Sequence, residues 1–278
     1  MTGEWGTAHR STSPVVVRTI DVALRDLPPA LAGLRIAHVS DFHFGRWDRV
    51  TACTQEILLS LDYDWLAATG DFGTRLRRWR RSAEIAKRFF EPLAQHRPTF
   101  AVLGNHDDLR LAAAGIPVRF LCNESVPIDH NGARVAIAGV DQTLLGTEDI
   151  GAALSEPSPC DVRILLAHYP STAYRLPAER VDLQLSGHTH GGQIRVPFFG
   201  CLWTHDAIPT RLARGLHSIA GTQVHVSPGI GVSPPIPVRL NCPAEITVLT
   251  LVPVESAQED RRPEIAAIPA IAAGCGQV

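Results

Sequence analysis

The stretch VDLQLSGHTH, residues 181–190, holds the most informative pattern in this chain. Its first six residues are largely apolar and typical of a strand in a buried sheet, and His188 and His190 follow at the carboxyl end of that strand. Open α/β sheets bind their ligands at this edge. A single His-x-His pair is weak evidence for a metal site, because histidines also occupy surfaces and cores. The pair therefore has to be interpreted together with the residues that end the other predicted strands.

Four earlier segments repeat this arrangement of an apolar strand followed by polar residues. The strands are predicted at 34–40, 64–69, 99–103 and 162–167, and the residues after them are Asp41 and His43, Asp71, Asn105 with His106 and Asp107, and His168. Side chains alternate along an extended backbone, so we expect Asp41 and His43 to point to the same side. Because ligand-type groups recur after all five strands, the pattern predicts that they meet at one edge of a sheet.

The donor set points to two metal ions. The five strand ends offer seven donors, with His106 in addition: Asp41, His43, Asp71, Asn105, His168, His188 and His190. A zinc ion takes about four protein ligands at most, so this set is too large for one ion. Oxygen and imidazole donors without thiolates suit manganese, iron or zinc, and argue against copper(I) and iron–sulfur clusters. Two ions about 3.5–4 Å apart can clamp a phosphoryl group during in-line displacement.

The ordered motifs D-x-H, G-D, G-N-H-D, H and G-H-T-H, spread over residues 41–190, resemble those of the calcineurin-like metallophosphoesterase superfamily. The extended motif Gly187–Gln193 is similar to that of bacterial phosphodiesterases, a group that includes membrane-associated UDP-2,3-diacylglucosamine pyrophosphatases. The segments 26–36, 226–231 and 237–249 look like that group as well. The resemblance implies two mixed sheets packed face to face and a hydrolase with two divalent metal ions, manganese in the first place and iron or zinc as alternatives.

The resemblance also implies a role for each motif residue. The first metal would be held by Asp41, His43 and His190, the second by Asn105, His168 and His188, and Asp71 would bridge them. His106 would face the substrate and protonate the leaving oxygen, with Asp107 orienting its ring. The nucleophile would be a hydroxide bridging the metals, so no covalent phosphoenzyme is expected.

A structural explanation exists for each residue taken alone. Asp, Asn and Gly favour turns, and a lone buried histidine is more often a hydrogen-bonded core residue than a ligand. Five independent turns have no reason to supply this residue set in this order, so the joint pattern favours the metal site. The remaining histidines have no ligand-type spacing and receive no role: His9, His38, His96, His130, His205, His217 and His225.

The alternation of strands and helices up to residue 190, and of strands afterwards, predicts an α/β fold of two mixed β-sheets packed face to face and flanked by helices. We expect a metallophosphoesterase domain at 14–252, a flexible tail at 1–13 and a loosely ordered tail at 253–278. Further strands are predicted at 14–22, 119–127, 134–140, 223–226 and 244–251, with a turn at 129–132. Helices are predicted at 51–61, 149–154, 171–175 and 77–95, the last with a kink or early stop at Pro92.

Charge is distributed unevenly along the chain. The run Arg75–Arg88 holds seven basic residues and the single acid Glu84, a net charge of +6, whereas the rest of the chain carries −8 and the whole chain −2. The run has helical spacing, and its usual interpretation is a surface helix with solvated arginines. The alternative is a peripheral contact with an anionic membrane or a nucleotide diphosphate. The apolar residues of 191–203 are interpreted as core, or as the lining of an acyl-chain groove.

Composition excludes several classes. No segment approaches the ~20 apolar residues of a membrane span, and the polar residues 1–13 lack the apolar core of a signal peptide. We expect a cytoplasmic enzyme, peripheral on the inner membrane face at most. The six cysteines are scattered without a C-x-x-C pair and are expected to be free thiols. No nucleic-acid partner is expected.

Three functions follow from this pattern. The first is hydrolysis of a phosphodiester or pyrophosphate bond, with UDP-2,3-diacylglucosamine as the leading lipid-linked substrate. The second is a soluble phosphodiesterase for cyclic nucleotides or other small diesters. The third is a non-catalytic metal-binding scaffold, which is expected to have lost ligands, whereas all seven motif positions are kept here.

Overall fold

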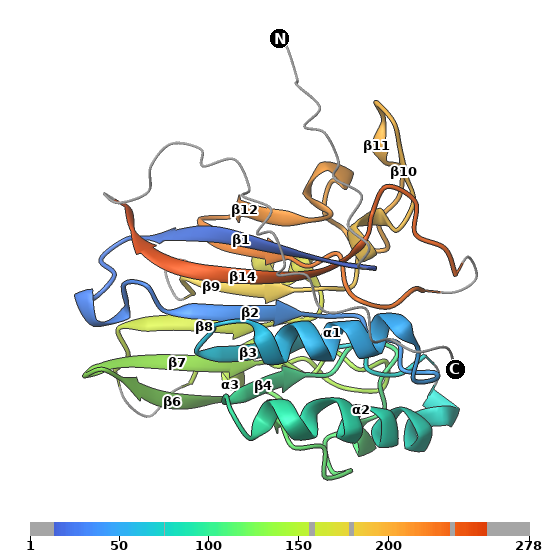
Figure 1. Ribbon diagram of the computed structural model, residues 1–278. Coiled ribbons are helices and arrows are strands. Elements are labelled where there is room, and N and C mark those ends of the chain that lie inside the picture. Colours follow the sequence, from blue (N-terminus) through green and yellow to red (C-terminus); the bar gives the residue numbers. More distant parts are fainter. Residues whose placement is uncertain (1–13, 75, 156–158, 178–180, 234–236, 255–278) are drawn as a thin grey trace.

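The computed structural model describes residues 14–74, 76–155, 159–177, 181–233 and 237–254 (Figure 1). The expected tails fall largely outside these residues, although the last strand continues to Pro253. Six strands form the first sheet in the order β1-β14-β2-β3-β4-β5. Their bounds are Val15–Leu24 (β1), Arg35–Val39 (β2), Trp65–Thr69 (β3), Thr99–Val102 (β4), Arg119–Phe120 (β5) and Ala244–Pro253 (β14). Strands β2, β3, β4 and β5 are parallel to one another, and β14 runs antiparallel to β2.

Six more strands form the second sheet in the order β12-β13-β9-β8-β7-β6. Their bounds are Glu124–His130 (β6), Ala133–Gly139 (β7), Val162–Leu166 (β8), Leu183–Ser186 (β9), Gly215–Ile219 (β12) and Thr222–Val226 (β13). Strands β7, β8, β9 and β13 are parallel, so their carboxyl ends lie at one edge. A separate hairpin joins β10 (Arg195–Val196) to β11 (Gly200–Cys201). The expected fold of two mixed sheets with flanking helices is confirmed.

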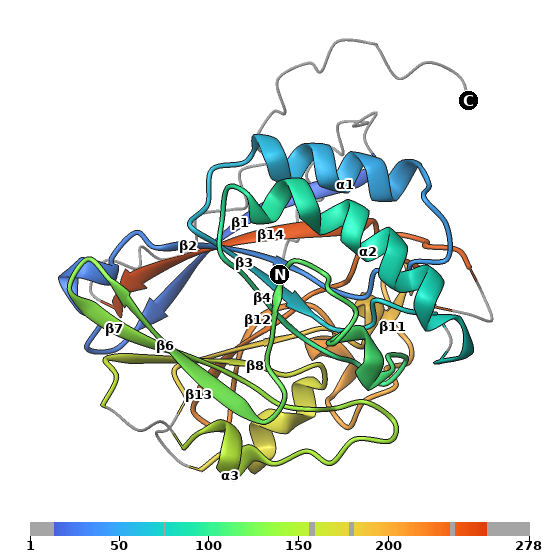
Figure 2. The ribbon, with the colours of Figure 1, turned by 90° about the horizontal axis from the view of Figure 1, so that it is seen from below.

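The layers are visible from below in Figure 2. Helices α1 (Arg49–Ser60) and α2 (Trp79–Ala94) cover the outer face of the first sheet, and the short helix α3 (Ile150–Ala153) lies beside the second sheet. Side chains such as Ile36 and Trp65 pack between the two sheets against Ile164 and Leu185. A phenylalanine-rich cluster fills the space between the first sheet and the helices. None of the described helices is long and apolar enough to cross a lipid bilayer.

The early stop expected at Pro92 is wrong, because helix α2 continues through Pro92 to Ala94. Proline has no N–H to donate to the carbonyl four residues earlier, which belongs to Arg88. The side-chain amide of Gln55 on α1 donates a hydrogen bond of 2.9 Å to that carbonyl and one of 2.8 Å to the carbonyl of Phe89. A tertiary contact therefore replaces the missing bond and lets the helix continue.

Two other predictions are corrected. The strand expected at 119–127 is divided into β5 and β6, which belong to different sheets. The core interpretation of 191–203 is wrong for its large side chains, because Phe198 and Trp203 are 91% and 70% exposed. The expected turn at 129–132 is confirmed, since Asn131 and Gly132 link β6 to β7 with positive φ. No disulfide joins the five cysteines of the described residues to one another, and Cys275 lies outside those residues.

Candidate metal centre

Left-handed backbone brings the predicted ligands together. Strand β2 ends at Val39, and Asp41 and His43 then have φ of 52° and 47°. The two residues therefore do not continue an extended strand, although their side chains do lie on the same side, in one donor group. Their backbone N–H groups instead donate to the carbonyls of Gly70 and Asp71, over 3.0 and 2.9 Å. These bonds join the loop after β2 to the loop after β3.

Three further donors share this conformation, with φ of 54° at Asp71, 68° at His188 and 50° at His190. Positive φ is uncommon outside glycine, and such strain costs roughly 1–3 kcal/mol per residue and clusters at functional sites. Close packing holds the loops in place. A Cβ atom on Gly187 would lie 2.5 Å from Oδ2 of Asp41, and one on Gly104 would lie 2.3 Å from Oδ1 of Asp71. Glycine is required at both positions because the backbone approaches a carboxylate directly.

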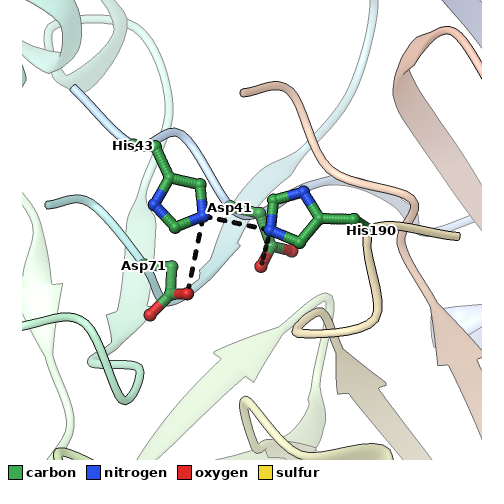
Figure 3. A group of neighbouring side chains, drawn as sticks. All are labelled: Asp41, His43, Asp71 and His190. Carbon is green, nitrogen blue, oxygen red and sulfur yellow. Dashed lines mark hydrogen bonds and ion pairs between the residues drawn. The ribbon is translucent and has the colours of Figure 1, made fainter. Parts of the chain in front are cut away.

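Four buried side chains form the first donor group, Asp41, His43, Asp71 and His190 (Figure 3). One ligand atom from each lies within 4.8 Å of all the others. Nε2 of His43 is 3.0 Å from Nε2 of His190 and 3.6 Å from Oδ2 of Asp71. Nε2 of His190 is 3.5 Å from Oδ1 of Asp41. Two imidazoles and two carboxylates thus converge from the loops after β2, β3 and β9.

A second donor group adjoins the first through Asp71. Nε2 of His168 lies 3.5 Å from Oδ1 of Asp71 and 3.1 Å from Oδ1 of Asn105. The His188 ring lies at the edge of the His168 ring, with 5.0 Å between centroids. One carboxylate oxygen of Asp71 faces each group, the arrangement that a bridging ligand requires. Which metal each residue holds stays a prediction.

Backbone carbonyls fix three of the four imidazoles. The hydrogen-bonded pairs are Nδ1 of His43 with Gly73 O (2.9 Å), Nδ1 of His168 with Thr69 O (2.7 Å) and Nε2 of His188 with His205 O (3.0 Å). A ring nitrogen that donates to a carbonyl carries the proton, so the other nitrogen keeps its lone pair for a metal. His205, which received no role from the sequence, therefore supports a ligand through its carbonyl.

Comparison with known proteins identifies the family. The family model of calcineurin-like phosphoesterases matches residues 34–192, the segment that contains all seven donors. The chain belongs to this family. Phosphodiesterase YaeI of Escherichia coli strain K12 is 30% identical over 238 residues, which cover 80% of this chain and 83% of that protein. An uncharacterized metallophosphoesterase of Aquifex aeolicus strain VF5 is 31% identical, over 88% of this chain and 94% of that protein.

Among solved structures, the NAD nucleotidase NadN of Haemophilus influenzae is similar with a TM-score of 0.47 and 14% identity, over 71% of this chain and 45% of that chain. The family is metal-dependent, and the donor groups of this phosphoesterase are consistent with that dependence.

Burial sets the protonation of Asp41 and of three of the four histidines. It raises the pKa of Asp41 to about 7, although the charge of His168 opposes the shift. Burial lowers the pKa of His43 to about 4 and that of His188 to about 3, and it lowers the pKa of His190 as well. These imidazoles are therefore neutral near pH 7, as metal ligands must be. The raised pKa of Asp41 shows a buried carboxylate that lacks a sufficient counter-charge, which a divalent cation would supply.

Asp71 and His168 form a charged pair in the metal-free protein. Burial alone would raise the pKa of Asp71, but the charge and hydrogen bond of His168 and the charge of His43 lower it below its usual range. Burial alone would likewise lower the pKa of His168, but Asp71 raises it to about 10. A proton on His168 thus occupies the position where the second group would need a cation. The first group fits a divalent metal ion by donor type and convergence. The second group has donors of a type that suits such an ion, and Asp71 and Asn105 both lie close to His168.

His106 and Asp107 lie beside the metal ligands. The backbone N–H of His106 donates to Oδ1 of Asp71 over 2.9 Å, and its half-buried ring is edge-on to the His43 ring at 5.3 Å. Burial, and then the charge of Asp71, raise the pKa of Asp107 to about 7. The Asp107 carboxylate accepts three backbone N–H groups, from Phe72, Gly73 and Gly104. Asp107 therefore ties the loops after β3 and β4 together, and any orientation of His106 by Asp107 acts through this backbone.

Arg239 was not found from the sequence. Its largely buried guanidinium donates to the carbonyl of Gly231, with Nε at 2.8 Å, and Nη2 lies 3.4 Å from Nδ1 of His190. Burial lowers its pKa from the usual range, and its charge helps to keep Asp41 ionised. The only signal was its place in the segment 237–249, because nothing in the local sequence marks Arg239 as a neighbour of His190. A guanidinium can only donate, so its contact with Nδ1 of His190 runs in the opposite sense to the contacts of the other three rings, whose partners are carbonyl acceptors.

Two unassigned histidines form a buried pair between the sheets. Nδ1 of His38 on β2 lies 2.8 Å from Nδ1 of His225 on β13, and Nε2 of His38 lies 2.8 Å from the hydroxyl of Thr69. Burial lowers the pKa of both, that of His225 to about 3. Both are therefore neutral core residues. His217 contacts the carbonyl of Arg214 over 2.7 Å and has no contact with the donor groups in the described residues.

Proposed function

We propose that this phosphoesterase hydrolyses a phosphodiester or pyrophosphate bond with two divalent metal ions, manganese being the preferred metal. The observation that carries the proposal is the Asp71 carboxylate, which faces both donor groups while its Oδ1 accepts the backbone N–H of His106. The leading substrate is UDP-2,3-diacylglucosamine, whose hydrolysis belongs to lipid A synthesis.

We assign different roles at the reacting phosphorus to the metal donors and to His106. Two bound divalent ions would supply a nucleophilic water at neutral pH and neutralise the phosphoryl oxygens. Asp71 and its neighbours hold the donor groups in a fixed relation, since their loops are cross-linked by backbone hydrogen bonds. We assign to His106, which is half-buried at the edge of the donor groups, the transfer of a proton to the leaving oxygen.

Two observations support a diester or diphosphate substrate. A relative that covers most of this chain bears the name phosphodiesterase. In addition, exposed arginines follow β3 directly before α2 and in its first turn, namely Arg77, Arg78, Arg80 and Arg81. One guanidinium group can donate two hydrogen bonds to a phosphate group, so a cluster of arginines suits a nucleotide diphosphate. A soluble phosphodiesterase for cyclic nucleotides or other small diesters is the second candidate, because the chemistry at phosphorus is the same.

A substrate panel on manganese-reconstituted protein tests the proposal. We expect turnover of diesters and of UDP-2,3-diacylglucosamine to exceed that of phosphomonoesters. A preference for monoesters would overturn the diesterase assignment. Assays with and without detergent then separate the lipid-linked nucleotide from small soluble diesters. Protein that binds metal but turns over none of these substrates would favour the non-catalytic metal-binding scaffold.

The His106→Ala variant tests the acid role separately from metal binding. We expect kcat to fall by about 100-fold or more, the usual contribution of a general acid, while metal content stays that of the wild type. His96→Ala is the matched control, because His96 is an exposed histidine at the opposite edge of the sheets. Equal kcat values for the two variants would remove His106 from the mechanism.

A further inference from the structure

Exposed large apolar side chains are concentrated at the edge that carries the metal ligands. The structure exposes twelve such side chains among the residues it describes, and ten lie on segments that follow β4, β7, β8, β9 or β13. The carboxyl ends of these strands form the metal edge. The other two, Leu59 and Val254, lie at the opposite edge, at the ends of α1 and β14. Exposed apolar groups that gather on one side of a protein mark an interaction surface.

The largest group lies on the β10–β11 hairpin and directly after it. Phe198, Phe199, Leu202 and Trp203, which we call the hairpin patch, are 91%, 77%, 63% and 70% exposed. In Figure 1 the hairpin projects away from the two sheets. Leu240 continues the patch, because it is 51% exposed and its backbone pairs with the base of the hairpin at Gln193 and Arg195. Four large apolar side chains within six residues thus point to solvent, two in the turn of the hairpin and two directly after β11.

The tip of the hairpin combines exposure with backbone strain. Phe198 has a φ of 69°, a conformation that is a genuine outlier for a bulky side chain. Burial of the ring does not offset this strain, because the side chain is 91% exposed. The base of the hairpin is closely packed, since a Cβ atom on Gly192 would lie 2.2 Å from Sγ of Cys201. A rigid base with a strained, solvent-exposed aromatic tip is expected where the tip serves binding.

The charge near the hairpin patch is positive. Residues 191–215 contain Arg195, Arg211 and Arg214 and a single acid, Asp206. The Asp206 carboxylate already accepts hydrogen bonds from Ser171 and from the backbone N–H of Ile208. The exposed arginines of 77–81 follow β3 at the same edge, whereas Arg75 lies outside the described residues. Aromatic and leucine side chains among arginines are the composition that binds anionic lipid interfaces.

We propose that the hairpin patch inserts into the headgroup region of an anionic phospholipid membrane and holds the metal edge against the membrane surface. The contact would reach the metal centre through a short path. The chain runs from Trp203 to His205, whose carbonyl accepts the hydrogen bond from Nε2 of the ligand His188. The proposal is independent of which phosphoester the centre cleaves.

Sedimentation of the full chain with vesicles tests this proposal. The vesicles are phosphatidylcholine alone, or phosphatidylcholine mixed with phosphatidylglycerol. We expect binding to the anionic vesicles that weakens with added salt, because exposed charges are screened. The variant Phe198→Ser/Phe199→Ser/Trp203→Ser should bind at least about ten-fold more weakly, since each aromatic ring loses its burial in the membrane. The variant Leu59→Ser/Val254→Ser is the matched control, because it removes exposed apolar groups at the opposite edge.

Metal content and the thermal unfolding midpoint should be the same in both variants and the wild type, so that failure of this proposal is distinguishable from failure of the metal centre. Equal vesicle binding by the hairpin variant and the wild type would overturn the proposal. So would the absence of vesicle binding by the wild type. A dimer that forms in solution and is lost in the hairpin variant would assign the patch to a second copy of the chain instead.

Discussion

An aspartate lies near each end of strand β3, and the two carboxylates make different kinds of contact. Asp64 precedes the strand, and its carboxylate accepts the backbone N–H of Arg35 at the start of β2 over 2.8 Å. Asp71 follows the strand in a left-handed conformation, and its two carboxylate oxygens face His43 and His168, one in each group of candidate metal donors. Asp64 completes the hydrogen bonding of the sheet, whereas Asp71 is the residue that we propose to bind metal.

The same contrast extends over both sheets. At the edge opposite to the metal centre, Asp161 accepts the backbone N–H of Arg134 and Asp182 accepts that of Arg163, each over 2.7 Å. Asn131-Gly132 and Ala220-Gly221 form two-residue turns at this edge, with positive φ that suits the twist of hairpins. Local hydrogen bonds and turns thus satisfy the backbone N–H groups at this edge. The metal edge instead carries strained donors and buried charges, which only the surrounding fold keeps in place.

The largest effect on the metal edge is expected from the Asp71→Ala variant. We expect activity to fall to background and metal binding to be lost at one or both groups, because a single carboxylate serves both. Metal content by elemental analysis and turnover of a diester would measure the effect. The matched control is Asp64→Ala, at the other end of the same strand, which should keep its metal. An Asp71→Ala variant with wild-type activity would contradict the mechanism.

Arg239→Lys tests whether the buried guanidinium positions His190. Lysine keeps the charge but loses the fork that contacts Gly231 and His190. We expect affinity for the first metal to fall by about 10-fold, at the lower end of the effect of losing a residue that orients a ligand. Calorimetric titration of metal-free protein would measure it. Arg134→Lys is the control, because Arg134 pairs with the exposed Asp129 far from the ligands. Equal affinities in the two variants would limit Arg239 to a structural role.

The sequence predicted the five strands and the donor residues that follow them because both depend on local patterns. Apolar runs identified the five strands that precede the donors, and the residues after them are the ones that the loops bring together. The left-handed backbone of Asp41 and His43 could not be predicted in this way. An extended and a left-handed continuation of β2 share the same residues, and only the bonds to the loop after β3 select the second.

Contacts between distant segments explain the other differences. Helix α2 passes Pro92 because Gln55 from another helix supplies hydrogen bonds. Arg239 reaches His190 from 49 residues away, and the hairpin patch is apolar yet exposed. Apolar composition predicts burial by default, so an exposed apolar segment is identified only when the surrounding surface is known.

The His38 and His225 pair, which joins the two sheets, predicts how stability depends on pH. The pKa of His225 is about 3 in the folded protein and ordinarily 6.5. As pH falls below 6.5, the unfolded chain binds a proton that the folded protein does not bind. The free energy of unfolding should therefore fall by up to about 1.4 kcal/mol per pH unit from this residue, and its contribution is complete above pH ~6.5. Urea unfolding of the wild type and His225→Asn between about pH 4 and pH 6.5 measures the difference. Equal slopes in the two proteins would contradict this assignment.

The smallest effect is expected at the start of β3. Replacing Asp64 by alanine leaves the N–H of Arg35 without its acceptor, which costs about 1 kcal/mol of unfolding free energy. Asp62→Ala is the closest control, since Asp62 is 82% exposed and pairs with the same arginine through its side chain. Loss of an exposed ion pair costs little, so that variant should unfold near the wild-type urea midpoint. Both variants should retain metal and activity, because neither residue contacts a ligand. A loss of metal in Asp64→Ala would mean that the two ends of β3 are coupled, and the division between a structural edge and a chemical edge would fail.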